Sequence, residues 1–148
     1  MKKYLSSSLV AGAMMAAVIA TAAPAHAAWV SQSCTGTKVD SKYLTHTFSN
    51  GVVSRDAILD SWYNDSTNVA CAKVWVLYPE QGPYTAANIY RVNADGSKTR
   101  IARDAGYFEV HAGAVNVTVS SGVKLQFEGT SKLPDGTLFT ARYNFTSH

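Results

Sequence analysis

Short β-like runs alternate with turn residues from Trp29 to the end of the chain, and this alternation constrains the fold more than any other feature. The runs are rich in valine, isoleucine, threonine and aromatic residues, and glycine, asparagine, aspartate and proline separate them. A succession of short strands with turn signals between them is typical of an antiparallel sandwich or barrel. We therefore expect an all-β fold, a single small β-sandwich or flattened barrel of about nine or ten short antiparallel strands.

The bounds of the expected strands follow from where the alternation starts and stops. These strands cover residues 39–48, 54–63, 70–78, 87–92, 98–103, 107–111, 114–120, 123–128 and 138–145. Hairpin turns are expected at Asn50-Gly51, Asp95-Gly96 and Pro134-Asp135-Gly136. Residues 54–63 also fit a short helix capped by Ser54, but the polar loop that follows them favours a strand.

The run at residues 70–78 has the most pronounced strand pattern. Ala72, Val74 and Val76 fall on one side, while Cys71 and Trp75 fall on the other. Because both sides are largely apolar, we expect this strand to lie in the middle of the sheet.

Residues 1–27 have the three parts of a cleavable signal peptide. Lys2 and Lys3 form a short basic start, an apolar run follows at residues 9–22, and Ala25-His26-Ala27 provides a small-x-small cleavage motif. The apolar run is shorter than the roughly 20 residues that span a bilayer. We expect cleavage after Ala27, which leaves residues 28–148 as a single secreted β domain without a membrane anchor.

Loss of this leader changes the charge of the protein. The whole chain has 13 Lys and Arg against 10 Asp and Glu, a net charge of +3. Without Lys2 and Lys3 the net charge falls to +1. No segment contains a cluster of lysine or arginine, so we expect no nucleic-acid partner.

Cys34 and Cys71 are the two cysteines of the chain. An export signal with an even number of cysteines predicts a disulfide between them, and two buried free thiols are the alternative. Neither cysteine has a Cys or His partner at the spacing of a zinc site. We therefore expect no metal and no cofactor.

Two pairs of residues suggest an enzymatic alternative, although no sequence motif with a defined catalytic mechanism is present. Glu109 and His111 lie two apart on the expected strand 107–111, so both would point to one side and could share a proton. Asp56 and Asp60 lie near Trp62, and glycosidases use two carboxylates. Both pairs also fit the polar side of a half-buried strand, so no catalytic residue is assigned.

Aromatic residues gather between residues 62 and 90. Flat rings suit the binding of sugars or proteins, although β-sheets also use them in their cores. Trp75 and Tyr78 belong to the expected central strand and are assigned to the core. The candidate ligand-binding residues are therefore Trp62, Tyr63, Tyr84 and Tyr90.

Cys34, the segment 68–74 (NVACAKV) and the segment 104–115 (DAGYFEVHAGAV) occur in an order that resembles a known family. They are similar to the small secreted spore-associated protein A group of Streptomyces and related actinobacteria. The chain departs from that pattern at Ala114, where a proline is expected, and at Val123-Lys124, where a further cysteine often lies. The resemblance implies an extracellular protein of the spore or cell surface, and it supplies no catalytic residues.

The expected function is that of a small secreted non-catalytic β-protein associated with the spore, the envelope or another extracellular ligand. Its partner would be a cell-wall component, a glycan or an extracellular protein. Two alternatives stay open. One is a small secreted hydrolase that uses Asp56 with Asp60 or Glu109 with His111, and the other is an inhibitor or toxin-like effector that presents residues 79–84 to a target.

Overall fold

The computed structural model describes residues 28–148, and the expected signal peptide at residues 1–27 lies outside the described residues. The strands are β1 (Ala28–Val30), β2 (Thr37–Thr47), β3 (Val53–Asn64), β4 (Val69–Val76), β5 (Tyr84–Val92), β6 (Lys98–Tyr107), β7 (His111–Thr118), β8 (Lys124–Lys132) and β9 (Leu138–Thr146). One turn of 3-10 helix, η1 (Pro79–Gln81), joins β4 to β5. The predicted all-β class is confirmed.

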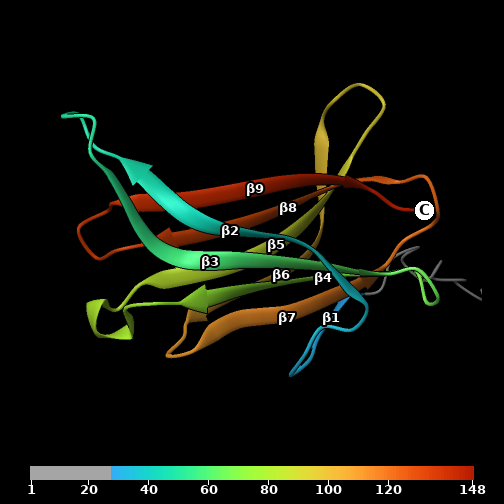
Figure 1. Cartoon of the computed structure of the whole chain (residues 1–148), viewed down its shortest axis with the longest axis horizontal. Helices are drawn as coiled ribbons and strands as arrows, with labels where there is room; N and C mark the ends of the chain where they lie inside the picture. The colour runs from blue at the N-terminus through green and yellow to red at the C-terminus, as the bar shows by residue number, and fades with distance from the viewer. Residues whose placement is uncertain (1–27) are drawn as a thin grey trace, which may run out of the picture.

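All of these strands belong to one antiparallel sheet in the order β1-β7-β4-β3-β2-β9-β8-β5-β6. The sheet curls over on itself, so that β5 comes close to β4 and β8 comes close to β3, and Figure 1 shows the curled sheet with β2 and β3 in front. We call β1, β7, β4, β3 and β2 the first layer, and β9, β8, β5 and β6 the second layer. The edge strands β1 and β6 approach each other, so the sheet is a nearly closed, flattened barrel.

The structure corrects two of the expected strand positions. Residues 107–111 do not form a strand, because β6 ends at Tyr107, a turn occupies residues 108–110, and β7 begins at His111. The chain reverses direction here and passes from the second layer to the first. The alternation of polar and apolar residues at 107–111 gives no sign of this reversal. Strand β1 was not expected, since three residues are too few to show an alternation. Strand β4 lies between β3 and β7, which confirms the predicted central strand.

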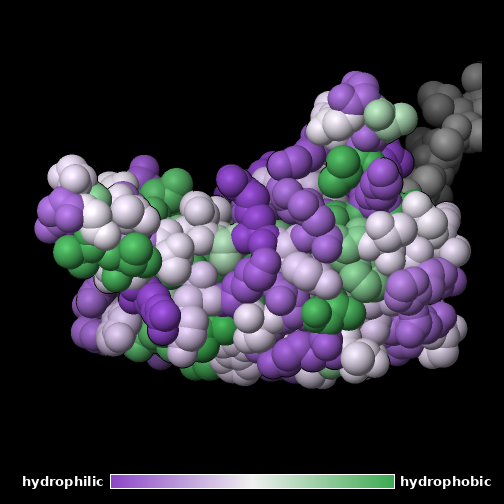
Figure 2. Space-filling view, turned by 45° about the horizontal axis from the view of Figure 1, so that its top comes forward, coloured by the Kyte–Doolittle hydropathy of each residue, from purple (hydrophilic) through white to green (hydrophobic). Residues whose placement is uncertain are grey.

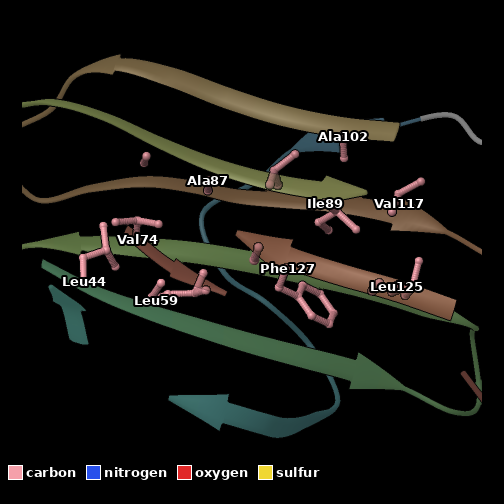
Figure 3. Packing of buried hydrophobic residues seen from close by; sticks show 14 of the residues in the cluster. Leu44, Leu59, Val74, Ala87, Ile89, Ala102, Val117, Leu125 and Phe127 are labelled. Carbon is pink, nitrogen blue, oxygen red and sulfur yellow. The ribbon is translucent and has the colours of Figure 1, made fainter. Parts of the chain in front are cut away.

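The interior of the barrel lies between the two layers, as Figure 3 shows. Leu44, Leu59 and Val74 of the first layer face Ile89 and Phe127 of the second. Each large apolar side chain that is fully buried contributes about 1.5–3 kcal/mol to folding. This shared core explains why the sheet closes instead of leaving one apolar side in water.

Gly129 of β8 marks a place where the layers approach closely. A Cβ atom at this position would lie 3.0 Å from both Leu44 Cδ1 and Val74 Cγ2. Since these are atoms of buried core side chains, glycine fits here without displacing the opposite layer.

A β-bulge in β3 changes which side chains face the interior. Leu44 of β2 pairs with Ala57 and the next residue, Thr45, pairs with Arg55, so Asp56 is the extra residue. A bulge interrupts the regular alternation of a strand. As a result both Asp56 and Ala57 are buried, and Asp56 accepts a hydrogen bond from the hydroxyl of Ser131 in β8.

Residues 31–36, which we call the crossing segment, connect β1 to β2. Because β1 pairs with β7 while β2 pairs with β3, this segment crosses over the outer side of β4. The Cys34–Cys71 disulfide fixes it there with a Cα–Cα distance of 5.6 Å, which confirms the predicted bridge. Lys73 of β4 also donates a hydrogen bond to the carbonyl oxygen of Gln32 at 3.1 Å.

Candidate functional site

Glu109 and His111 do not form the pair that the sequence suggested. Glu109 is exposed in the turn between β6 and β7. His111 begins β7 and packs its ring edge-on against Trp75, with 5.3 Å between the ring centroids. Because the two residues do not share a strand, the spacing that would have aligned their side chains does not apply.

Asp56 and Asp60 lie on opposite sides of β3. Asp56 faces the interior, where Ser131 donates to it. Asp60 faces outward and accepts hydrogen bonds from Lys38 Nζ at 2.8 Å and Trp75 Nε1 at 2.9 Å. A glycosidase needs both carboxylates at one substrate-binding space. The bulge at Asp56 removes that arrangement, so these residues do not support the hydrolase alternative.

Burial and hydrogen bonding act in opposite directions on the Asp60 carboxyl. Burial acts to raise its pKa, but hydrogen bonds from Lys38, Ser41 and Trp75 and the charge of Lys38 outweigh it, so the pKa lies below its ordinary value. Burial lowers the pKa of the neighbouring Lys73, although the Asp60 charge partly opposes this. The Asp60 carboxyl is therefore stabilised in its charged form, and it has a structural role in which it contacts Lys38 and Trp75 on the outer side of the first layer.

Two of the candidate aromatic residues, Trp62 and Tyr63, lie in the first layer. Tyr63 is only 2% exposed, packs against Phe145 and donates its hydroxyl to Asn68. Trp62 is half-buried on the outer side of β3, with Lys38 Nζ 4.9 Å from its ring centroid. The structure therefore places Tyr63 in the interior and Trp62 on a different surface from Tyr84 and Tyr90.

Tyr84 and Tyr90 both lie on the outward side of β5, near its two ends. Tyr84 packs edge-on against Tyr107 of β6 with 5.2 Å between the ring centroids, and the two residues are 38% and 77% exposed. Tyr90 donates its hydroxyl to Glu128 at 3.2 Å. Burial, together with the charge and hydrogen bond of Glu128, raises the pKa of Tyr90.

Lysine and arginine side chains surround these tyrosines on the outer side of the second layer. Residues directly opposite each other in antiparallel strands point to the same side, and every second residue of a strand does so too. The register therefore defines one surface, which we call the cationic face. It carries Lys98, Arg100 and Arg103 from β6, Lys124 and Lys132 from β8, and Arg142 from β9.

Little negative charge balances the cationic face. Glu128 is the acidic residue on it, and it forms an ion pair with Arg142 at 2.6 Å. The other cationic side chains of this face have no carboxylate within 4.0 Å among residues 28–148. The positive charge of the chain is therefore concentrated on this face, whereas the whole chain has a net charge of only +3.

An open hollow adjoins the cationic face near the β5–β6 hairpin. It has a volume of about 380 Å³, and its lining includes Lys98, Lys124, Gln126 and Asn144. Lys98 Nζ donates to Gln126 Oε1, and Gln126 Nε2 donates to Asn144 Oδ1, each at 2.8 Å. These contacts hold two amides in place beside two ammonium groups.

A second hollow, of about 450 Å³, lies near the other end of the face. Tyr84, Tyr107 and Lys132 line it together with Leu133 and Pro134. Tyr84 lies directly opposite both Tyr107 and Lys132 in the sheet, so the three side chains occupy adjacent positions on this surface. This arrangement offers an apolar platform beside a positive charge.

A third hollow, of about 310 Å³, lies between the β2–β3 hairpin and the turn that precedes β9. Asp56, Tyr78 and Phe139 are among its lining residues. The residues of η1 next to it are exposed, and Gln81 reaches this hollow. Its wall carries the buried carboxylate of Asp56 and the exposed carboxylate of Asp135, but none of Asp60, Glu109 and His111.

The exposed apolar residues do not gather into one broad patch on the side of the molecule shown in Figure 2. Hydrophobic groups appear there as separate areas among hydrophilic ones, and one of them lies at the projecting left end. Figure 1 places the β2–β3 hairpin at that end, and this hairpin exposes Phe48, Val52 and Val53.

A comparison with protein-family models, curated proteins and solved structures found no match for this chain. Within residues 28–148, no three or more His, Cys, Asp or Glu side chains are grouped so that they could hold a metal ion. The same part of the chain contains no helix long and apolar enough to cross a membrane.

Sequence reasoning missed the cationic face because its residues are spread from position 98 to position 142. Only Lys98 and Arg100 show the spacing of two that aligns side chains within one strand. Lys124 and Lys132 share the same parity but lie eight positions apart. A search for positive charge at every second position of the expected strands would have found part of this surface.

Proposed function

We propose that this chain is a secreted, non-catalytic binding protein that associates with the outer surface of its cell or spore through the cationic face. The observation that carries the proposal is the concentration of lysine, arginine and tyrosine side chains on one side of the second layer. Exposed charged and aromatic residues that converge on one surface are typical of binding sites.

Two further features support a role outside the cell. The Cys34–Cys71 disulfide suits an oxidising compartment, where such bridges persist. The expected signal peptide and the resemblance to spore-associated protein A both point to export and surface association.

The non-catalytic part of the proposal rests on the positions of the candidate residues. Asp56 and Asp60 are separated by β3, and Glu109 is exposed in a turn away from the hollows described above. A hydrolase needs a nucleophile or base in reach of a second polar group at one concave site. Asp56 contacts the Ser131 hydroxyl and lines one hollow, but neither Asp60 nor Glu109 lies there to act as its acid–base partner.

Co-sedimentation of the oxidised, exported protein with isolated cell-wall and spore-surface material tests the proposal. We expect the protein to sediment with at least one of these fractions and Tyr107→Ala to reduce the bound amount several-fold. Tyr43→Ala is the matched control, since Tyr43 is also an exposed tyrosine but lies on β2 in the first layer.

Two results would overturn the proposal. One is an exported protein that stays in the supernatant with every fraction. The other is an equal loss of binding in Tyr107→Ala and Tyr43→Ala, because binding would then not depend on the cationic face.

A further inference from the structure

We infer that the ligand of the cationic face is an acidic polysaccharide, a sugar chain that carries anionic groups at repeated intervals. This inference rests on the proposed function, because it names the ligand class of the same surface.

Charge is the first argument. Arg100, Arg103, Lys124 and Lys132 have no carboxylate partner among the described residues, and Lys98 donates to the neutral amide oxygen of Gln126. A concentrated positive surface attracts polyanions and gains free energy when their counterions are released. The acid that is present, Glu128, is already engaged by Arg142 and Tyr90.

The extent of the surface favours a polymer over a single small anion. Lys124 and Lys132, neither of which has a carboxylate partner among the described residues, lie at the two ends of β8. Eight positions separate them along the strand, a distance of about 27 Å between their backbones. One small ion cannot contact groups so far apart, whereas a chain laid along the face meets a positive charge at both ends.

The two hollows supply groups that suit sugar units. Tyr84 and Tyr107 present ring surface next to Lys132, which fits a sugar ring that carries an acidic group. At the other hollow, Oδ1 of Asn144 is engaged by Gln126, which leaves the Asn144 Nδ2 group to donate to a sugar hydroxyl beside the charges of Lys98 and Lys124.

The aromatic residues favour a polysaccharide over a single-stranded nucleic acid. Proteins that bind such strands stack successive bases on several free rings along a groove. Here Tyr84 and Tyr107 pack against each other at one end, and the hydroxyl of Tyr90 is engaged by Glu128. The middle of the face therefore lacks the row of free rings that base stacking requires.

Protection of a sheet edge does not account for the whole face. Charged side chains on an edge strand prevent it from pairing with another copy, and β6 is an edge strand. That role covers only the three cationic residues that β6 contributes to the face, Lys98, Arg100 and Arg103. Lys124, Lys132 and Arg142 lie on β8 and β9, which are paired on both sides.

The decisive experiment measures the affinity of the exported, oxidised protein for polygalacturonate, for neutral dextran and for single-stranded DNA. We expect clear preference for polygalacturonate, with affinity falling roughly tenfold or more between about 50 and 200 mM salt. The double variant Arg100→Gln/Arg103→Gln should bind polygalacturonate at least roughly tenfold more weakly, because two unpaired charges are lost.

Arg55→Glu is the matched control, because it changes the net charge of the protein by the same amount from the first layer. Arg55 stacks on Tyr43 there, 4.6 Å from the ring centroid. Its affinity for polygalacturonate should stay within about twofold of the unmodified protein, since long-range charge effects at the surface are screened by salt.

Equal affinity for dextran, a preference for DNA, or an equal loss in Arg55→Glu would each overturn the inference. Unchanged affinity in Arg100→Gln/Arg103→Gln, with new aggregation, would also overturn it and assign these residues to edge protection. If the protein sediments with envelope material in a Tyr107-dependent way but ignores polygalacturonate, the ligand class is wrong and the proposed function stands.

Discussion

Trp75 of β4 donates its indole N–H to the carboxylate of Asp60 on the neighbouring strand β3 at 2.9 Å. Lys38 of β2 approaches the same oxygen at 2.8 Å, so one carboxylate joins three adjacent strands. We expect Trp75→Phe to lower the free energy of unfolding by about 1–3 kcal/mol, because a buried charged acceptor loses a donor. Denaturant unfolding at neutral pH measures this loss. Trp62→Phe is the control, since no side-chain hydrogen bond of Asp60 involves Trp62; an equal loss there would contradict the prediction.

The same contacts predict how acid affects stability. The pKa of Asp60 in the folded protein lies below 3.8, the ordinary value taken for the unfolded chain. A carboxyl with a lowered folded pKa contributes stability that is fully present above the unfolded pKa and is lost as pH falls through the folded pKa. We therefore expect the free energy of unfolding to decrease below about pH 4. Asp60→Asn should show a flatter dependence across that range, and an unchanged slope would contradict this role.

The disulfide should contribute strongly to stability, since it links residues separated by 37 positions. On the chain-entropy model, a loop of this length stabilises the folded state by about 4 kcal/mol. We expect Cys34→Ser/Cys71→Ser to lose much of this amount in denaturant unfolding. Titration of thiols before and after unfolding provides the control, because the native protein should show none. Free thiols in the native protein would contradict the bridge.

Gly129 should tolerate no side chain, because Leu44, Leu59 and Val74 of the first layer face it. We expect Gly129→Ala to destabilise the protein by about 1–3 kcal/mol through overpacking of the core. Thermal or denaturant unfolding measures the change. The adjacent residue Thr130 faces outward, so Thr130→Ala should have a smaller effect. Equal stability of Gly129→Ala and the unmodified protein would show that the layers can separate at this point.

The side chain of Asp104 connects β6 to β7, two strands that are not hydrogen-bonded neighbours in the sheet. Asp104 of β6 accepts a hydrogen bond from the backbone N–H of Gly113 in β7 at 2.7 Å. We expect Asp104→Ala to cost about 1–3 kcal/mol, because a buried N–H loses its acceptor. Amide hydrogen exchange at Gly113 should accelerate in the same variant. Asp104→Asn keeps an acceptor oxygen and should retain most of the protection; similar exchange in both variants would argue against this contact.

The sequence by itself determined the all-β class, the central position of β4 and the disulfide. Each of these depends on a local pattern or on simple counting. Residues 70–78 are apolar on both sides, which only a central strand of such a sheet requires. Two cysteines in a chain with an expected export signal leave one possible intramolecular bridge. The turn-forming pairs also indicated where two hairpins reverse direction. Asn50-Gly51 lies in the turn between β2 and β3, and Asp95-Gly96 lies in the turn between β5 and β6.

Only the tertiary structure decided how the candidate residues group, because grouping depends on register and bulges. One extra residue in β3 turns Asp56 inward while Asp60 faces outward, which separates two carboxylates that sequence spacing had suggested as a pair. The reversal at residues 108–110 similarly separates Glu109 from His111.

The cationic face is a second grouping that only the tertiary structure decided, in this case a grouping of charged side chains. Arg103 and Arg142 lie far apart along the chain, yet the pairing of β6, β5, β8 and β9 brings them to one surface. Charge counted along the sequence averages this surface with the acidic residues of the turns and of the first layer. The folding of the sheet separates the two groups, because antiparallel register decides which side each side chain faces.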